Sequence, residues 1–345
     1  MKNRIDEILK EMKSFKKTLY NKQEVLPELF ALQDELVNLT FNDNHAENSN
    51  FRIWDVEDHL EKLNENCGYI ADELLAQFKS DCKIICNIIK AEKSGQAGEN
   101  KAFKALETLR CKNTVLKNIE FVVEDHRTEL DAIVITEKAV FIVEVKNPGK
   151  DICIDERGNY CRIRTDKMVF DKNIGEKMNE KEYLLREALK GCGFENANIR
   201  NMVVFTNSAI NVENKFPYIH TCYLSEMPHI IGGYDGENIH SDDDIKLMTD
   251  AINFNKCHEC YAMPIDIENF KITFATLMAT LEKASATNDF SEIDDEKNTE
   301  SETKKIQESV KEDKNKDKKF VSYFLASAAV VTIVSAAVVK MIGKR

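Results

Sequence analysis

The chain has 345 residues, of which 43% are hydrophobic and 31% charged, and a formal net charge of −12. This composition is typical of a folded globular protein, and the acidic balance excludes a protein that coats nucleic acid with a broadly basic surface. The sequence contains neither of the glycine-rich loops G-x-x-x-x-G-K-[S/T] and G-x-G-x-x-G, which argues against a nucleotide-driven motor.

Residues 1–93 are expected to form an N-terminal helical region. Apolar residues recur three and four positions apart in three series that begin at Ile5, Leu29 and Val56, and this spacing predicts one buried face per helix. Pro27 is expected to start the second helix. Each series covers only a few heptads, so a helical hairpin or small bundle is favoured over a long coiled coil. The apolar faces also allow association with a second copy of the chain, and nothing in the region indicates chemistry.

The pattern changes at Gly95, and residues 94–213 are expected to form a separate domain. Strand and helix patterns are mixed here, which predicts an α/β (α+β) fold with a mixed sheet. The expected elements are a helix at 98–110, strands near 118–124, 129–136 and 139–147, a polar span, a helix near 176–190 and a strand near 201–205, followed beyond this domain by a strand near 218–223. Helices over 243–254 and 266–283 complete a C-terminal extension of the folded body, residues 214–283.

Three charges interrupt the two apolar strands of ELDAIVITEKAVFIVEVKN, residues 129–147. If the turn is centred in the TEKA stretch, opposed residues of the hairpin have numbers that add up to 275, so Asp131 faces Glu144. Lys146 lies two residues beyond Glu144 and projects from the same face. Two carboxylates and one amine therefore meet on one patch.

Opposed carboxylates repel each other unless a positive charge lies between them. Hard oxygen ligands at this spacing suit Mg²⁺ or Mn²⁺, and such an ion polarises a phosphate and lowers the pKa of a bound water. Glu99 precedes Ala102, Phe103 and Leu106 by three, four and seven residues, which places its carboxylate on the inward face of a helix. The alternative interpretation is a surface ion pair and a helix whose first turn favours a carboxylate.

Three stretches of the sequence, GE at 98–99, ELDAIVI at 129–135 and FIVEVKNPG at 141–149, resemble the NERD, or nuclease-related, domain. That family is grouped with the PD-(D/E)xK restriction-endonuclease-like superfamily, so the resemblance implies a restriction-endonuclease-like core. It implies that Asp131 and Glu144 bind Mg²⁺, that Lys146 is the catalytic lysine, and that Glu99 completes the acidic, metal-binding site. Such domains often carry an Asn-Pro…Gln element before the following helix, whereas this chain has NIGEK with Lys177 in that position.

Ten cysteines are scattered along the chain and are expected to be reduced thiols. The CHEC stretch places Cys257 and Cys260 at C-x₂-C spacing, and His220 and Cys222 are the nearest candidates for completing a zinc site. The second C-x₂-C pair of a typical zinc ribbon is absent, so a structural role for these cysteines stays open.

Residues 320–339, FVSYFLASAAVVTIVSAAVV, contain no charged residue and are flanked by lysines. A helix of this length, with a rise of about 1.5 Å per residue, crosses a hydrocarbon core of about 30 Å. The preceding residues 284–319 hold 8 Lys and 11 Asp+Glu with one aromatic residue, which predicts a disordered charged linker. The N-terminal stretch MKNRIDEILKEMKSF lacks the apolar core of a secretory signal. We therefore expect a single-pass C-terminal anchor with the folded body cytoplasmic.

Two functions remain in view. The first is a membrane-anchored, Mg²⁺-dependent nuclease that hydrolyses nucleic-acid phosphodiester bonds, with DNA favoured over RNA. Residues 94–213 carry 19 basic and 20 acidic residues, and this near-neutral balance permits contact with a polyanion. The second is a catalytically inactive NERD-like module that serves as a membrane-tethered binding or scaffold protein.

Overall fold

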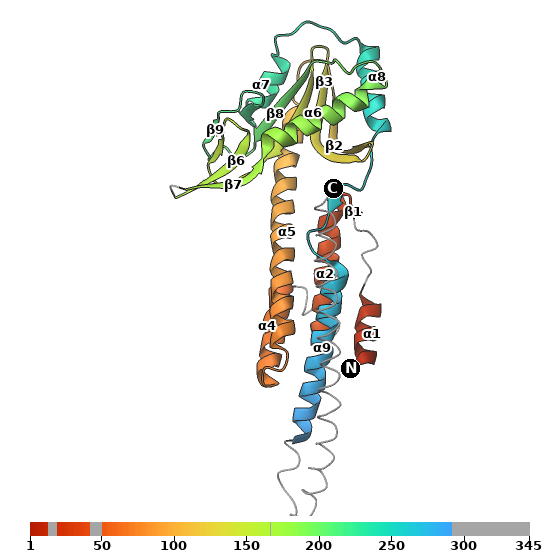
Figure 1. Ribbon diagram of the computed structural model, residues 1–345, viewed down its shortest axis with the longest axis vertical. Coiled ribbons are helices and arrows are strands. Elements are labelled where there is room, and N and C mark those ends of the chain that lie inside the picture. The colour runs from red at the N-terminus through yellow and green to blue at the C-terminus, as the bar shows by residue number, and fades with distance from the viewer. Residues whose placement is uncertain (13–18, 42–49, 166, 292–345) are drawn as a thin grey trace, which may run out of the picture. The chain divides into compact units, whose positions relative to one another are not determined.

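A computed structural model of the chain describes residues 1–12, 19–41, 50–165 and 167–291. The segment Met1–Ser285 forms one compact unit, in which an α/β part adjoins a bundle of helices (Figure 1). Of the predicted linker, residues 284–291 continue a helix and the remainder lies outside the described residues, as does the predicted membrane helix at 320–339. None of the helices in the described ranges has the length and apolar composition that crossing a membrane requires.

The α/β part is built on a five-stranded mixed sheet. In spatial order its strands are β10 (His220–Tyr223), β8 (Ile199–Phe205), β4 (Val140–Lys146), β3 (His126–Thr136) and β2 (Asn113–Val123). Strands β4, β8 and β10 run parallel, whereas β3 is antiparallel to both of its neighbours. The central strands read as almost continuous apolar runs because helices cover both faces of the sheet. The predicted mixed α/β fold is confirmed.

The predicted register of the central hairpin is also confirmed. Ala132 pairs with Val143 and Ile135 with Val140, so the numbers of opposed residues add up to 275. The turn closes through a 2.9 Å hydrogen bond from the Thr136 N–H to the Ala139 carbonyl. The paired residues of both strands are buried, so a slip of one residue would move every side chain to the other face.

Helices cover both faces of this sheet. Helix α6 (Ile174–Lys190) crosses one face and α8 (Asp242–Phe254) packs beside it (Figure 1). The C-terminal part of α5 (Asp72–Leu106) and the short α7 (Met227–Gly232) cover the other face. Helix α6 begins where the Asn173 side chain accepts a 2.8 Å hydrogen bond from the Glu176 N–H, a typical N-cap.

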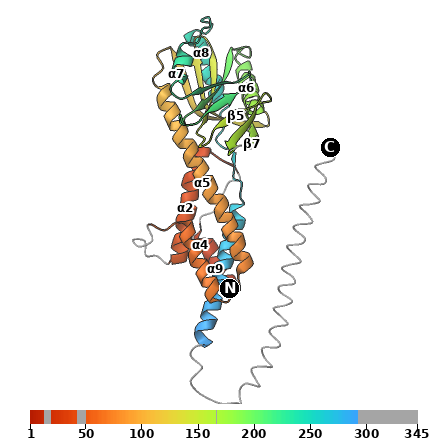
Figure 2. The same ribbon diagram turned by 90° about the vertical axis from the view of Figure 1, so that its left-hand side faces the viewer.

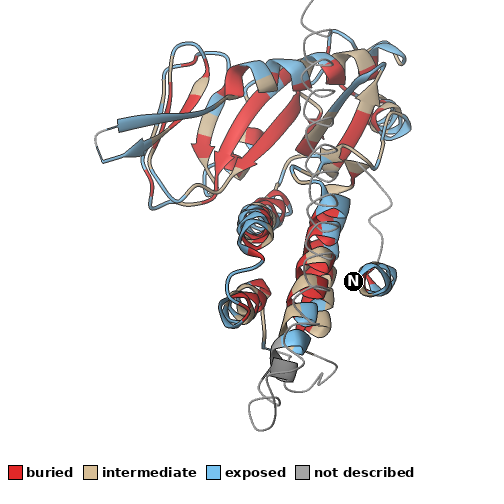
Figure 3. Ribbon diagram, turned by 60° about the horizontal axis from the view of Figure 1, so that its bottom comes forward, coloured by how far each residue is buried: buried red, intermediate tan, exposed pale blue. Residues whose placement is uncertain are grey.

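The polar span after the hairpin forms strands that were not predicted from the sequence. A second sheet contains β7 (Lys167–Asn173), β6 (Asn159–Arg164), β5 (Ile152–Ile154) and β9 (Val212–Asn214), in that spatial order. Strands β6 and β7 form a hairpin with a largely exposed end, the pale blue ribbon with the grey tip in Figure 3. These strands are short or solvent-exposed, so they lack the apolar alternation that reveals a half-buried strand.

The predicted small helical bundle is confirmed. Its core combines side chains of α1 (Lys2–Glu11), α2 (Lys22–Phe41), α4 (Ile53–Asn66), the first half of α5, and α9 (Ile267–Ser291). Helices α2, α4, α5 and α9 run side by side in both views (Figures 1 and 2). A two-stranded pairing of β1 (Leu19–Tyr20) with β11 (Tyr261–Ala262) ties the entry of α2 to the entry of α9. Pro27 does not start α2 but lies inside it, so the helix lacks one backbone hydrogen bond there.

Helix α5 is continuous across residue 94, where the sequence pattern suggested a boundary between two elements. It passes through Gly95 and Gly98 and ends at Leu106, earlier than the predicted end at residue 110. Each glycine costs a helix about 1 kcal/mol relative to alanine. The side chains of α5 pack both in the core of the helical bundle and in the core against the five-stranded sheet, and this packing outweighs the cost. A Cβ atom on Gly98 would lie 3.0 Å from the Asn147 Cβ and 3.2 Å from the Thr206 Oγ1. Glycine therefore lets α5 approach the ends of β4 and β8.

The two glycines of α5 give a matched pair of substitutions. Gly98→Ala should destabilise the chain by about 1–3 kcal/mol, because the added methyl group overpacks the contact with Asn147 and Thr206. Gly95→Ala should raise the free energy of unfolding by up to about 1 kcal/mol, because a Cβ there meets only the Glu99 Oε1, at 3.8 Å. Urea unfolding followed by circular dichroism measures both. Stabilisation by both variants would contradict the proposed close approach.

Candidate active site

All four residues predicted from the sequence, Glu99, Asp131, Glu144 and Lys146, line one pocket of about 470 Å³. The pocket lies at the end of β4, where α5 comes close to the strand. Six acidic and six basic side chains contribute to its lining. The formal charges of the lining therefore cancel, although individual carboxylates are buried.

Asp131 lies where the ladder between β2 and β3 is interrupted. The pairing skips Asp131 and its expected partner Asn118, whose φ of 49° is a left-handed conformation that asparagine adopts more readily than most residues. The Asp131 Oδ2 accepts a 2.7 Å hydrogen bond from the backbone N–H of Val145. This bond holds the buried carboxylate beside the strand that carries Glu144.

Glu144 is almost fully buried, with 1% of its side chain exposed, and three ammonium groups surround it. Its Oε1 accepts hydrogen bonds from Lys146 and, at 3.3 Å, from Lys177, and its Oε2 accepts one from Lys181. Burial alone would raise the pKa of Glu144, but the nearby ammonium groups outweigh it and hold that pKa well below the ordinary value. Glu144 is therefore a carboxylate at neutral pH.

Lys146 remains an ammonium group because carboxylates surround it. Burial would lower the pKa of Lys146, but Glu144 and Asp131 outweigh burial and raise it. Lys146 is thus a hydrogen-bond donor and a positive charge at neutral pH, and it is not available as a base.

Glu99 has a different partner, Lys22. The Nζ of Lys22 lies 2.6 Å from the Glu99 Oε1 and 3.0 Å from the Glu129 Oε1. Burial would lower the pKa of Lys22, but Asp131, Glu129 and Glu99 raise it above the ordinary value. Lys22 is the first residue of α2. The N-terminal helical region therefore places a charged side chain in the pocket, which its sequence pattern did not indicate.

Lys181 and Lys22 were not among the predicted site residues, although the sequence carries a signal for both. Each lysine lies on the apolar stripe of its helix, as Glu99 does: Lys22 precedes Val25, Leu26 and Leu29, and Lys181 follows Met178 and precedes Leu184, Leu185 and Ala188. A charge on such a stripe is costly unless a partner is buried with it. A buried charge on a helix does not by itself indicate this pocket, because Asp81 and Lys271 are also buried and do not line it.

Neighbouring ammonium groups lower the pKa of two lysines near the pocket. Lys146, together with burial and Lys177, lowers the pKa of Lys172 to about 8. The neighbouring charge of Lys181 lowers the pKa of Lys177, against an opposing effect of Glu144. Shifts of this kind are characteristic of functional sites, where like charges are held together in a cleft.

Comparison with protein families finds a match to the segment that carries most of the residues lining this pocket. Residues 94–206 match the family model of NERD, the nuclease-related domain. This segment is a NERD domain. The known affiliation of NERD is the PD-(D/E)xK superfamily. Comparisons with curated proteins and with solved structures gave no match. Glu99, Asp131, Glu144 and Lys146 all fall inside the matched segment, whereas Lys22 lies outside it.

Two carboxylates of the pocket are of the chemical type that binds magnesium. Mg²⁺ is commonly bound by one or two carboxylates and completes its shell with water and substrate phosphate. Asp131 and Glu144 supply two buried carboxylates in one pocket. Within the described ranges, however, no three His, Cys, Asp or Glu side chains could hold a metal ion together. Glu99 is engaged by Lys22 and Glu144 by three lysines, so a cation at Asp131 and Glu144 would have to displace ammonium groups from Glu144.

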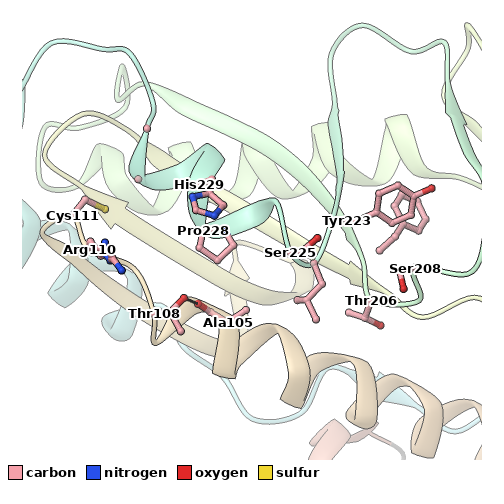
Figure 4. A pocket seen from close by; sticks show the side chains of 14 residues that line it. Ala105, Thr108, Arg110, Cys111, Thr206, Ser208, Tyr223, Ser225, Pro228 and His229 are labelled. Atoms are coloured by element: carbon pink, nitrogen blue, oxygen red, sulfur yellow. Dashed lines mark hydrogen bonds between the residues drawn. The ribbon is translucent and has the colours of Figure 1, made fainter.

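A larger cavity, of about 950 Å³, lies between the end of α5, α7 and the ends of β8 and β10. Figure 4 shows Arg110, Cys111 and His229 near one another in it, with Thr206, Ser208 and Tyr223 farther along. Its lining contains no carboxylate. This cavity therefore lacks the hard anionic ligands that a divalent cation requires.

The structure does not bring together the four residues that the sequence suggested as ligands of a zinc ion, so that prediction is wrong. His220 and Cys222 belong to β10, at one edge of the five-stranded sheet, whereas the Cys257 N–H bonds to the Glu120 carbonyl of β2 at the other edge. The Sγ atoms of Cys257 and Cys260 lie 3.1 Å apart. No third metal-ligating side chain joins them in the part of the chain that the structure describes.

Proposed function

We propose that the NERD domain hydrolyses phosphodiester bonds of nucleic acid with the help of Mg²⁺ or Mn²⁺. The observation that carries this proposal is the meeting of Asp131, Glu144 and Lys146 at one end of the β3–β4 ladder, in a pocket open to solvent. Asp131 and Glu144 would hold the cation. When bound, the cation would polarise the scissile phosphate and lower the pKa of an attacking water.

Lys146 acts as a donor in this proposal. Because the pKa of Lys146 is raised, its ammonium group can orient the attacking water and stabilise the negative charge that develops on the phosphate. It cannot remove a proton from that water. Lys177 belongs to α6 and has 43% of its side chain exposed, so it would contact a phosphate oxygen in this proposal.

The hairpin of β6 and β7 supports a nucleic-acid substrate. Residues 159–173 contain four basic and two acidic residues in a chain whose net charge is −12. Arg162 is paired with Asp171 at 2.9 Å, and both line the pocket. Arg164 and Lys167 oppose each other nearer the hairpin end and are exposed. A basic arm that starts at the pocket favours a polyanion over a small phosphate ester.

The low pKa of Lys172 gives a pH dependence to this binding. Lys172 lines the pocket and its pKa is about 8, so its positive charge is present below pH 8 and is lost above it. The affinity for a DNA oligonucleotide, measured by fluorescence anisotropy in EDTA, should therefore fall between pH 7 and pH 9. Lys172→Gln should flatten this dependence and reduce the slope of log K against log salt by about one. The same pH profile in Lys172→Gln and wild type would contradict this role.

A second candidate function is a binding module without catalysis. Its supporting observation is that ammonium groups already neutralise Glu99, Glu129 and Glu144 in the pocket. A pocket whose charges are satisfied internally does not require a cation for its stability. Such a module would bind its partner in the same way with and without divalent cations.

The two functions are separated by a cleavage assay on the full-length chain. The nuclease should degrade DNA or RNA in Mg²⁺ or Mn²⁺, and excess EDTA should abolish the reaction. Binding without cleavage in any of these conditions would favour the binding module. DNA, RNA and single-stranded substrates are compared in parallel, because the preference for DNA is itself part of the proposal.

The proposed location of this activity is a membrane surface, with the NERD domain in the cytoplasm. The support is the uncharged run of twenty residues at 320–339, which is long enough to cross a bilayer as a helix. Association of two copies through the N-terminal helical region is also part of the proposal. Tethered copies would present their pockets at the surface to which they are held.

A further inference from the structure

The β6–β7 hairpin carries most of the exposed apolar side chains of the NERD domain. Among the described residues of this domain, five large hydrophobic side chains are exposed, and four of them belong to the hairpin: Ile163, Met168, Val169 and Phe170. Met168 is 65% exposed and Phe170 is 61% exposed. Single exposed apolar residues are common on soluble proteins, whereas a contiguous group of them marks a contact surface.

Three of these side chains project from one face of the hairpin. Ile163 pairs directly with Met168, and Phe170 lies two residues farther along β7, so the three share a face. Arg164 pairs with Lys167, and these two side chains project from the opposite face, as Val169 does. The hairpin therefore offers a group of apolar side chains on one face and two positive charges on the other.

The hairpin begins at the pocket of the candidate active site. Arg162, Asp171 and Lys172 line that pocket, and Phe170 precedes Lys172 by two residues, which is about 7 Å along a strand. Strand β5 pairs with β6 only as far as Arg162, so in the described ranges the ladder beyond it joins β6 and β7 alone (Figure 3). A nucleic-acid strand held in the pocket would thus pass the apolar face within about two base steps of 3.4 Å each.

A nucleic-acid strand with unpaired bases matches the chemistry of both faces. Its phosphates are negatively charged, and each base presents a flat face that stacks on aromatic side chains. In a closed duplex the base faces are stacked on one another, so an apolar side chain reaches them only where a step is opened. A second copy of the chain would cover the apolar face, but it would not account for the basic residues or for the position of the hairpin at the pocket.

We propose that the β6–β7 hairpin holds unpaired bases of the nucleic acid that the pocket binds. Phe170 stacks on a base and Met168 packs beside it, while Arg164 and Lys167 contact phosphates. This inference rests on the proposed function for the class of ligand. It names that ligand more closely, as single-stranded nucleic acid or a duplex with unpaired bases next to the pocket.

The test compares a single strand of DNA with a duplex of the same sequence, by fluorescence anisotropy of the full-length chain in EDTA. Wild type should bind the single strand more tightly than the duplex. Phe170→Ala should weaken binding to the single strand by about 5- to 150-fold, the loss expected for one stacked base, and should change the affinity for the duplex little. Phe170→Trp keeps an aromatic ring and should restore the wild-type affinity.

Two controls separate contact with a base from other effects. Tyr183→Ala removes an aromatic side chain of α6 that is 55% exposed, and this variant should bind both DNAs as wild type does. An abasic oligonucleotide keeps the phosphates and lacks the bases, so wild type and Phe170→Ala should bind it with equal affinity.

Equal affinities of wild type and Phe170→Ala for the single strand would overturn the proposal. A difference that persists on the abasic oligonucleotide would also overturn it, because Phe170 would then act without touching a base. Conversion of a dimer to a monomer by Phe170→Ala, with an unchanged affinity for the single strand, would assign the apolar face to contact between copies of the chain instead.

These results are distinguishable from those that test the proposed function. A selective loss of single-strand binding in Phe170→Ala, together with no cleavage by wild type in Mg²⁺ or Mn²⁺, would keep the base contact and remove the nuclease. Cleavage by wild type, together with an unchanged single-strand affinity in Phe170→Ala, would keep the nuclease and remove the base contact.

Discussion

The Lys146→Met variant is expected to cleave nucleic acid about 10²–10³-fold more slowly than wild type in Mg²⁺. The substitution removes the one ammonium group that is directed at the pocket from β4 and keeps an aliphatic chain of similar length. Glu144 retains Lys177 and Lys181 as partners, so the fold should be preserved. Initial rates at saturating substrate measure the effect, and the anisotropy assay shows that binding is largely unchanged.

Asp131→Asn should reduce cleavage at least as strongly, because it removes a ligand of the proposed cation. The amide oxygen of asparagine can still accept the hydrogen bond from the Val145 N–H, which is 2.7 Å in the native chain. The variant therefore separates the loss of a ligand from the loss of a structural bond. Glu61→Gln, which removes a carboxylate of the helical bundle, is the matched control. Wild-type rates in both Lys146→Met and Asp131→Asn would refute this site.

Glu144→Leu is expected to lower the free energy of unfolding by about 3–5 kcal/mol, because it leaves a buried ammonium group without its counter-charge. Lys146 and Lys177 retain 17% and 43% exposure of their side chains and can turn toward solvent. Lys181 is 1% exposed and cannot. The double variant Glu144→Leu/Lys181→Met should recover most of the loss, because an apolar pair of similar volume replaces the ion pair.

Urea unfolding of the two single variants and the double variant completes this thermodynamic cycle. The pKa of Glu144 is lowered on folding, so its stabilising effect is fully present above the ordinary carboxylate pKa of about 4.3. That effect is lost as the pH falls toward the folded pKa. A double variant that is as unstable as Glu144→Leu would show that Lys181 does not depend on this carboxylate.

The sequence predicted the central hairpin and its three charged site residues because the paired parts of both strands are buried. Continuous apolar runs fix the register, so the positions of Asp131, Glu144 and Lys146 followed from the location of the turn. Glu99 followed from its place on an apolar helical stripe. These inferences depend only on local periodicity, which a buried strand or helix expresses directly.

Other parts of the site depend on contacts between distant segments. Lys22 is 77 residues from Glu99 in sequence, and only the packing of the bundle against the NERD domain brings them together. The second sheet escaped prediction because its hairpin is exposed, so polar and apolar residues do not segregate along it. The continuity of α5 was missed because two glycines normally disfavour a helix interior, whereas here one of them provides a close contact.

The 35-residue α5 has a mechanical consequence for the pocket. Its first turns are locked into the bundle by Phe78 and Cys82, and its later turns carry Glu99. Each residue advances an α-helix by about 100° of rotation. Inserting or deleting one residue between these points would therefore rotate the Glu99 carboxylate to another side of α5. A longer α5 would keep the orientation of Glu99 only if the helix gained whole turns between these points.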